Sequence, residues 1–183
     1  MCIAPVVRHL YFLILSKVFF CDVIKTATEG RRVQLGHPFS HKLGECAISF
    51  FVTKKLEKKL KGDFPQCLDG APLLLPSSGN QLRSGIDKWL DKQRIHPRMI
   101  AEFDDSALMK AFGQEGAGIF IAPSAIEAEV EWQYQVMAIG RVDEVKEHFY
   151  AISVERRVMH PVAATVVEAA RESLFADESS WDE

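Results

Sequence analysis

The sequence predicts an α/β domain with a mainly parallel sheet that helices cover on both faces. Between residues 71 and 140, short apolar segments alternate with amphipathic segments of helical period, which is the pattern of strand–helix–strand units. Ser and Asp residues that can cap helices follow three of the apolar segments. The 183 residues are 48% hydrophobic and 26% charged, which is typical of a globular domain and excludes disordered, collagen-like and coiled-coil chains.

Charge is distributed unevenly along the chain. Residues 1–62 contain eleven Lys and Arg against four Asp and Glu, a net charge of +7. Residues 63–183 contain eleven Lys and Arg against 21 Asp and Glu, a net charge of −10. The larger, acidic part lacks the positive surface that nucleic-acid binding needs. We therefore expect DNA contacts to come from a part of the protein outside this chain.

The segment 1–40 shows no regular pattern and is left unassigned. Its apolar residues 10–15 are followed by Lys17 and are predicted to form a buried strand or helix rather than a signal peptide. No apolar run is long enough to span a bilayer. Residues 25–40 are predicted to be a loop. The four cysteines are scattered, which favours a reducing cytoplasm over a disulfide-bonded secreted domain.

Strands are predicted where apolar residues cluster. The first covers 46–52, and the second covers 71–76, which two prolines bound. Between them, residues 54–61 contain five lysines without interleaved aromatic residues. This segment is predicted to be solvated, with nucleic-acid binding as the weaker alternative.

Two helices follow, separated by a strand at 98–103. The first is predicted to be capped by Ser77 or Ser78, with four apolar residues on one face: Leu82, Ile86, Trp89 and Leu90. The second is predicted to begin in the run 104–106 and to end at Gly116. Its predicted inward residues are Leu108, Ala111 and Phe112.

The alternation continues towards the C-terminus. Ser124 and Glu127 have the spacing of a capping box, which predicts the start of a further helix. The remaining elements are predicted in this order: a strand at 118–122, a helix from Ser124 to Tyr134, strands at 136–139 and 149–154 separated by the polar stretch 143–148, a helix from Pro161, and a loose acidic tail at 177–183.

Polar residues follow three predicted strands, and open parallel sheets bind ligands beyond the carboxyl ends of their strands. The three junctions are 77–80, 104–106 and 123–124. Each places hydroxyl or carboxylate groups beside the free N–H groups of a helix start, where anions and polar ligands bind. The junctions predict a common ligand cleft, and helix capping alone is the alternative interpretation of each.

Patterns typical of catalysis are weak. Ser124 lies in Ala-Pro-Ser-Ala and not in a nucleophile elbow. Gly113, Gly116 and Gly118 precede a strand, whereas the glycines of a dinucleotide fingerprint follow one, so packing and turn roles are predicted for them. The sequence predicts no enzyme and no cofactor.

The order of elements from about His41 to Phe175 resembles the effector-binding domain of LysR-type transcriptional regulators. The segment 116–123, Gly-Ala-Gly-Ile-Phe-Ile-Ala-Pro, is similar to the family's Gly-x-Gly…Pro segment. Residues 149–157, followed by His160-Pro161 and a helix, are similar to its return into the first lobe. The resemblance implies the type II periplasmic-binding-protein fold, in which two α/β lobes and two crossover strands enclose an effector cleft.

Within this family, the chain resembles the branch that activates sodium/proton antiporter genes. The run 102–113, Glu-Phe-Asp-Asp-Ser-Ala-Leu-Met-Lys-Ala-Phe-Gly, is the most specific match, and segments 44–46, 122–123, 140–142 and 151–156 support it. This resemblance implies a domain that senses an effector, here sodium or lithium, for a transcriptional activator.

The resemblance also implies which residues contact the effector. In this sequence they are Ser77, Ser78, Asn80, Phe103, Asp104, Asp105, Pro123 and Ser124. Hard cations prefer oxygen ligands, so the two aspartates and the serine hydroxyls are the candidate group for a monovalent cation. Helix capping, with the cation sensed elsewhere, is the alternative.

The resemblance implies that residues 41–64 and 141–176 form lobe I and that residues 65–140 form lobe II. The first strand–helix–strand portion of lobe I is not recognisable, so lobe I is expected to be incomplete. The winged helix-turn-helix through which the family contacts DNA is not recognisable in 1–40, which fits a truncated or frameshifted start. The family implies a cytoplasmic homodimer or homotetramer without membrane contact. A solute-binding protein of the same fold and a small α/β enzyme remain the alternatives.

Overall fold

The structure of this chain, a computed structural model, describes residues 39–153 and residue 168. Three predictions lie outside the described residues: those for the segment 1–38, for the helix from Pro161 apart from residue 168, and for the acidic tail. Among the described residues, no helix is both long enough and apolar enough to cross a bilayer.

The chain divides into two compact units, and both boundaries between them fall within strands. One unit is Glu45–Glu147, and the other combines Met1–Gly44 with His148–Glu183. Strand β1 (Phe39–Val52) and strand β5 (Met137–Ser153) each belong partly to both units. The connection between the units is therefore made by two extended segments and not by loops.

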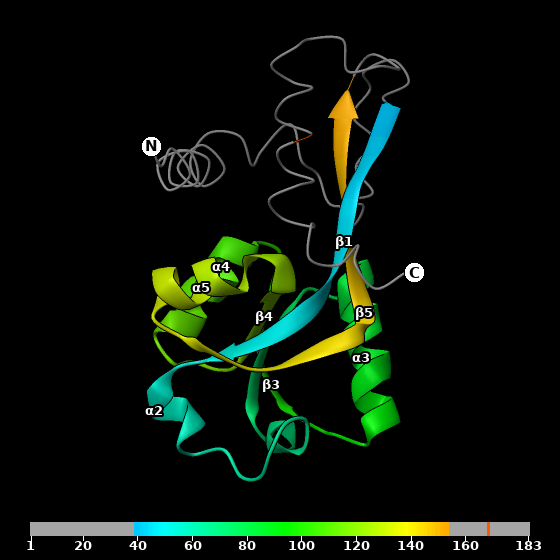
Figure 1. The fold of residues 1–183 in the computed structure, drawn as a ribbon. Helices are drawn as coiled ribbons and strands as arrows, with labels where there is room; N and C mark the ends of the chain where they lie inside the picture. The colour runs from blue at the N-terminus through cyan, green and yellow to red at the C-terminus, as the bar shows by residue number, and fades with distance from the viewer. Residues whose placement is uncertain (1–38, 154–167, 169–183) are drawn as a thin grey trace, which may run out of the picture. The chain divides into compact units, whose positions relative to one another are not determined.

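Strands and helices alternate in the unit Glu45–Glu147, which confirms the predicted α/β class (Figure 1). Between β1 and β5, the elements are α2 (Lys54–Glu57), a 3₁₀ turn at Gln66–Leu68, β2 (Pro72–Pro76), α3 (Gln81–Gln93), β3 (Arg98–Phe103), α4 (Ser106–Gln114), β4 (Phe120–Pro123), a 3₁₀ turn at Ser124–Ile126, and α5 (Glu127–Tyr134).

Three strands of this unit run parallel. β2 and β3 pair with Pro76 opposite Phe103, and β4 joins β2 through a parallel bridge between Leu73 and Ile119. β1 is antiparallel to β4, and the order on that side is β4-β1-β5. The sheet is therefore mixed, whereas a mainly parallel sheet was expected. β1 pairs with β4, which is distant in sequence, and not with β2, the strand that follows it, so the alternation of strands and helices along the chain did not reveal its direction.

The sheet is covered on both sides, with α3 on one face and α4 and α5 on the other (Figure 1). Phe50 and Phe51 of β1 are neighbours in a strand, so their fully buried side chains point to opposite faces. The ring of Phe50 lies 5.9 Å from that of Trp89 on α3, and the ring of Phe51 lies 5.4 Å from that of Phe120 on β4. Aromatic burial on both faces makes β1 the centre of the hydrophobic core.

The last strand is longer than predicted. A single strand, β5, covers both predicted strands and the polar residues between them. Asp143, Glu144 and Lys146 are exposed, whereas Val142 and Val145 are buried. Buried and exposed positions therefore do not alternate strictly along this part of β5, so the sequence alone does not distinguish it from a connection.

The buried face of α3 is as predicted, but that of α4 is not. Met109 and Gly113 of α4 are buried, while Leu108 and Phe112 are 50% and 48% exposed and Ala111 is also exposed. A side chain at Gly113 would overlap the ring of Phe120. The absence of a side chain there allows α4 to approach β4 closely, which turns Leu108 and Phe112 outward.

We predict that Gly113→Ala destabilises the chain. Overpacking against a buried ring costs about 1–3 kcal/mol, and the better helix propensity of alanine recovers only about 1 kcal/mol. The urea midpoint of unfolding is expected to fall.

Gly85→Ala in α3 is the matched control, because the added Cβ would lie 3.0 Å from Cγ1 of Val145 instead of overlapping a ring. Its midpoint is expected to change less. Equal urea midpoints for Gly113→Ala and Gly85→Ala would contradict a close approach of α4 to Phe120 at Gly113.

Candidate functional site

The three predicted ligand junctions lie along one edge of the sheet. Because β2, β3 and β4 run parallel, their carboxyl ends point in the same direction. The backbone N–H of Ser77 donates a hydrogen bond to the carbonyl oxygen of Phe103 at 3.0 Å, which joins the first two junctions directly. Ser124 follows β4 at the same edge. The three strand ends therefore point the same way, and their role as one ligand site stays a prediction.

At the first junction, the helix is capped by a different residue from the one predicted. Asn80 is the N-cap of α3, and its Oδ1 accepts a hydrogen bond from the N–H of Leu82 at 2.8 Å. Ser77 is half-buried and Ser78 is exposed in the turn before it. The prediction that Ser77 or Ser78 caps the helix is wrong. Their hydroxyls therefore do not serve as the N-cap of α3.

At the second junction, a buried ring lies beside two exposed carboxylates. Phe103 is buried, and its ring lies 5.3 Å from that of Phe112 on α4. Asp104 and Asp105 are exposed. Asp105 is the N-cap of α4, where its Oδ1 accepts from the N–H of Ala107 at 2.7 Å. Asp105 thus has the capping role that the sequence allowed, and Asp104 does not share it.

At the third junction, the predicted capping box is not formed. Pro123 ends β4 opposite Ile48 of β1, and Ser124 begins a 3₁₀ turn. The Oε2 atom of Glu127 accepts a hydrogen bond from Ser49 Oγ of β1 at 2.5 Å. It also lies 3.3 Å from Nη2 of Arg141. The glutamate therefore satisfies a fully buried hydroxyl across the sheet instead of the start of its own helix.

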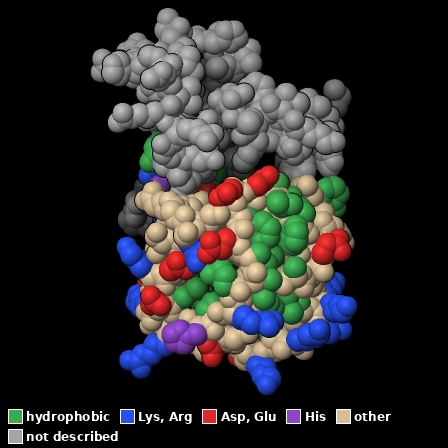
Figure 2. Space-filling model, turned by 180° about the vertical axis from the view of Figure 1, so that it is seen from behind, with side chains coloured by type: hydrophobic (Ala, Val, Ile, Leu, Met, Phe, Trp, Pro, Cys, Tyr) green, Lys and Arg blue, Asp and Glu red, His purple; other side chains and the backbone are tan. Residues whose placement is uncertain are grey.

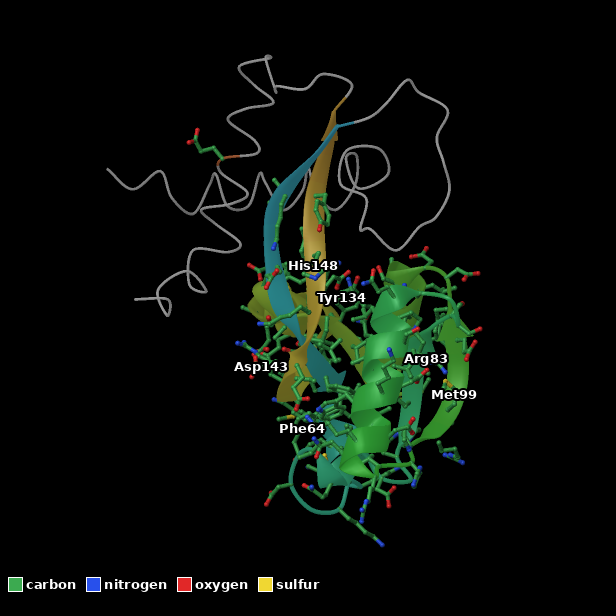
Figure 3. All side chains as sticks on the ribbon, turned by 90° about the vertical axis from the view of Figure 1, so that its right-hand side faces the viewer. Phe64, Arg83, Met99, Tyr134, Asp143 and His148 are labelled. Atoms are coloured by element: carbon green, nitrogen blue, oxygen red, sulfur yellow. The ribbon has the colours of Figure 1, made fainter. Side chains whose placement is uncertain are left out.

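One buried cation organises the same edge and was not predicted from the sequence. Nη1 of Arg83 on α3 donates to the carbonyl oxygen of Pro76 at 3.0 Å and to Oε1 of Glu102 at 2.9 Å. Nε of Arg83 bonds both carboxylate oxygens of Asp87 at 2.8 and 2.9 Å. Burial lowers the pKa of Arg83, but the bonds to Asp87 and Glu102 raise it above its ordinary value overall. Arg83 thus holds α3 against the ends of β2 and β3 (Figure 3).

A second group of titratable side chains interacts electrostatically across α4, α5 and β5. Burial raises the pKa of Glu147 on β5 to about 7, although the charge of Lys110 on α4 opposes the rise. Burial lowers the pKa of Lys110, against the effects of Glu147 and Asp105. The pKa of Tyr134 on α5 is raised by burial and by the charge of Asp105. Perturbed groups of this kind are concentrated at functional sites.

These residues were not predicted from the sequence, for two reasons. Glu147 belongs to the polar stretch that was interpreted as a connection between strands, and Lys110 lies in a helix whose inward face was predicted incorrectly. A pattern based on junctions could not identify them, since neither residue directly follows a strand. Asp105 is the one predicted residue that interacts with this group.

This edge offers hydroxyl and carboxylate oxygen atoms that could contact a ligand. It also holds the buried guanidinium of Arg83 and the half-buried amine of Lys110. In the described part of the chain, no group of three or more His, Cys, Asp and Glu side chains is placed to hold a metal ion. An open hollow of about 280 Å³ is lined by Thr53, Leu56, Gly116 and neighbouring residues. This hollow includes none of the eight predicted ligand residues, so it is not a candidate for the predicted site.

Comparison with known proteins gives the family. A model described as the LysR substrate binding domain matches residues 40–175. The chain is 34% identical over 156 residues to the transcriptional activator protein NhaR of Escherichia coli K12, and equally to that of Shigella flexneri. These alignments cover 85% of this chain and 48% of the relative, so the chain spans about half the length of the curated relatives it matches.

Solved structures agree with the fold. The Citrobacter freundii effector binding domain with three substitutions superposes with a TM-score of 0.59 at 16% identity, covering 82% of this chain and 73% of that one. The regulatory domain of HypT from Salmonella typhimurium gives a TM-score of 0.54 at 20% identity, covering 84% and 73%. At such identities these similarities establish the fold alone, which is that of the LysR regulatory domains and is type II periplasmic-binding-protein-like. Together with the family model over residues 40–175 and the 34% identity to a curated activator, they show that the chain belongs to the LysR family of transcriptional regulators, as a substrate-binding, or effector-binding, domain.

Proposed function

We propose that the chain is the effector-sensing and oligomerisation domain of a transcriptional activator that responds to sodium or lithium and controls a sodium/proton antiporter gene. The observation that supports this most is the 34% identity to the activator NhaR over 156 residues. The run 102–113 supports the same branch, and it includes the β3–α4 junction with its two aspartates.

The two alternative functions do not agree with the family. LysR-type proteins are transcriptional regulators and not enzymes, so the small α/β enzyme is excluded. A solute-binding protein of the same fold would not match a curated activator at this identity. The activator function is therefore the one that the comparisons favour.

In the proposed mechanism, the effector binds at the carboxyl edge of the sheet. Its contacts come from Ser77, Ser78, Asn80, Phe103, Asp104, Asp105, Pro123 and Ser124. A cation is expected to prefer the exposed carboxylate of Asp104, because Asp105 already accepts a hydrogen bond at its helix. Binding that differs in affinity between two arrangements of the units would shift their populations.

The whole activator would act in the cytoplasm as a homodimer or homotetramer. DNA would be contacted through a winged helix-turn-helix that lies outside this chain. The assignment of residues 41–64 and 141–176 to an incomplete lobe I, and of residues 65–140 to lobe II, stays a prediction.

We predict that Asp104→Asn weakens a sodium-specific response. In thermal-shift titrations with NaCl or LiCl, compared with choline chloride at equal ionic strength, the wild-type chain is expected to be stabilised by the small cations. The apparent affinity of the variant is expected to fall about tenfold or more, because a hydrogen bond or ligand contact with a charged group contributes about 1.5–3 kcal/mol.

Asp91→Asn is the matched control, since Asp91 is an exposed carboxylate on α3 away from the strand ends. It should leave the sodium response unchanged. A response that Asp104→Asn does not alter would remove Asp104 from the site, and a wild-type chain that does not distinguish sodium from choline would contradict the proposed effector.

We also predict that Glu147 makes stability depend on pH. Its folded pKa of about 7 is above its ordinary value of 4.5, so between these values the folded chain holds a proton that the unfolded chain has lost. The stabilisation from this proton is complete below about pH 4.5 and is lost as the pH rises through about 7. Glu147→Gln is therefore expected to gain melting temperature relative to wild type between pH 5 and pH 8.

Glu115→Gln, at an exposed carboxylate that ends α4, is the control and should track the wild-type profile. Parallel melting profiles for Glu147→Gln and wild type across this range would show that Glu147 titrates with an ordinary pKa.

A further inference from the structure

A short segment after β1 concentrates positive charge. Residues 54–61, which we call the lysine segment, contain five lysines and one glutamate, a net charge of +4. The residues that follow it in the unit, 63–147, contain eight Lys and Arg against 14 Asp and Glu, a net charge of −6. The five lysines are all exposed: Lys54, Lys55, Lys58, Lys59 and Lys61. None of them forms an ion pair with a described residue. The lysine segment is therefore a local positive surface on an acidic unit.

Two leucines hold the lysine segment against the core. α2 begins after Thr53, whose Oγ1 accepts a hydrogen bond from the N–H of Leu56 at 3.3 Å, and hydrogen-bonded turns continue to Leu60. Leu56 and Leu60 are partly buried and pack against the hydrophobic core. Residues four apart in helical turns share a face, so Lys55 and Lys59 are neighbours on another face, where their like charges repel. An anion bound beside them would relieve this repulsion.

The same two lysines line one concave surface. Lys55 and Lys59 belong to the walls of the open hollow described above, together with Thr53 and Gln114. The Thr53 hydroxyl and the Gln114 amide are uncharged groups that can donate hydrogen bonds to a phosphate oxygen. Glu115 also lines the hollow, and its carboxylate opposes an anion. Two amines against one carboxylate leave the hollow with a net positive charge.

We propose that the lysine segment binds the phosphate backbone of duplex DNA without reading its sequence, with one phosphate in the hollow between Lys55 and Lys59. Lysine binds phosphate as a point charge, and phosphate contacts position a protein on DNA but carry no sequence information. The lysine segment contains no aromatic residue, so it lacks the stacking platform that binds single strands. Of the two sequence-based interpretations of this segment, nucleic-acid binding is therefore favoured over simple solvation. The inference rests on the proposed activator, whose sequence-specific contacts stay with the winged helix-turn-helix outside this chain.

The lysine segment lies at the edge of the sheet opposite the predicted effector contacts. Phe51 of β1 lies opposite Phe120, the first residue of β4, so α2 follows β1 at the amino end of β4. The predicted effector contacts lie at the carboxyl ends of the parallel strands. Figure 2 shows Lys and Arg side chains gathered at the lower end of the unit, which is the end where Figure 1 shows α2. DNA bound at this end leaves the effector edge accessible.

The test is fluorescence anisotropy of a labelled DNA duplex of arbitrary sequence, titrated with the full 183-residue chain in potassium chloride and without sodium. The wild type is expected to bind with a dissociation constant of about 10⁻⁴ M or tighter at about 50 mM salt, and the affinity is expected to fall steeply as salt rises. Lys55→Gln/Lys59→Gln is expected to weaken binding at about 50 mM salt at least fivefold. It should also make the slope of log affinity against log salt shallower by about 1.8, since each phosphate contact contributes about 0.9.

Matched variants separate the lysine segment from net charge. Lys88→Gln/Lys92→Gln removes two exposed lysines of the same spacing from α3, on another side of the unit (Figure 1), and should leave both affinity and slope unchanged. Lys55→Arg/Lys59→Arg keeps the charges and should keep the slope. Glu115→Gln is expected to tighten binding, because it removes the opposing charge from the hollow. Circular dichroism verifies that each variant folds.

Four outcomes would overturn the proposal. A wild-type chain that does not bind the duplex contradicts it, and so does a slope that Lys55→Gln/Lys59→Gln leaves unchanged. An equal loss of binding in the α3 variant shows that net charge, and not the lysine segment, determines affinity. Equally tight binding of poly-L-glutamate identifies an acidic protein as the partner. Because the test contains neither sodium nor a specific operator, failure of the sodium response leaves these results unaffected, so the two proposals fail separately.

Discussion

The parallel register of β2 with β3 and β4 is the constraint on which the site depends. It places the ends of three strands at one edge. Each strand is followed there by residues whose side-chain oxygen atoms could contact a ligand. Arg83 reinforces this register, since one guanidinium bonds the last residue of β2, a carboxylate of β3 and a carboxylate of its own helix. A shift of β3 by one residue would break these bonds and would separate Ser77 from Phe103.

The two long strands relate this edge to the rest of the chain. β1 is the buried centre of the unit, and β5 borders it, yet both continue beyond the unit boundaries at Gly44 and Glu147. Glu147, whose pKa is shifted by burial, is the last residue of β5 in this unit. A change in its charge therefore occurs at the boundary where the chain passes from one unit to the other.

Local patterns in the sequence predicted the parts of the fold that local forces determine. The strand 98–103 and the buried face of α3 follow from apolar period and proline boundaries, and the structure has both. The prediction of the inward face of α4 was wrong because this face depends on the close approach of Gly113 to Phe120. No property of α4 alone reveals that approach. The strand-end junctions were predictable from alternation. Lys110 and Glu147 were not, because their pKa shifts arise from burial between distant segments.

The contact between Ser49 and Glu127 has a consequence for how the family can vary. The hydroxyl is fully buried on the central strand, and the carboxylate that satisfies it is 78 positions away in sequence. Losing the glutamate alone would leave the buried serine hydroxyl without its hydrogen-bond partner. Replacing the serine with alanine removes the hydroxyl, so no partner is required. Mutations at these two positions should therefore be accepted in order, serine first, and pairs of relatives should differ at both positions more often than chance allows.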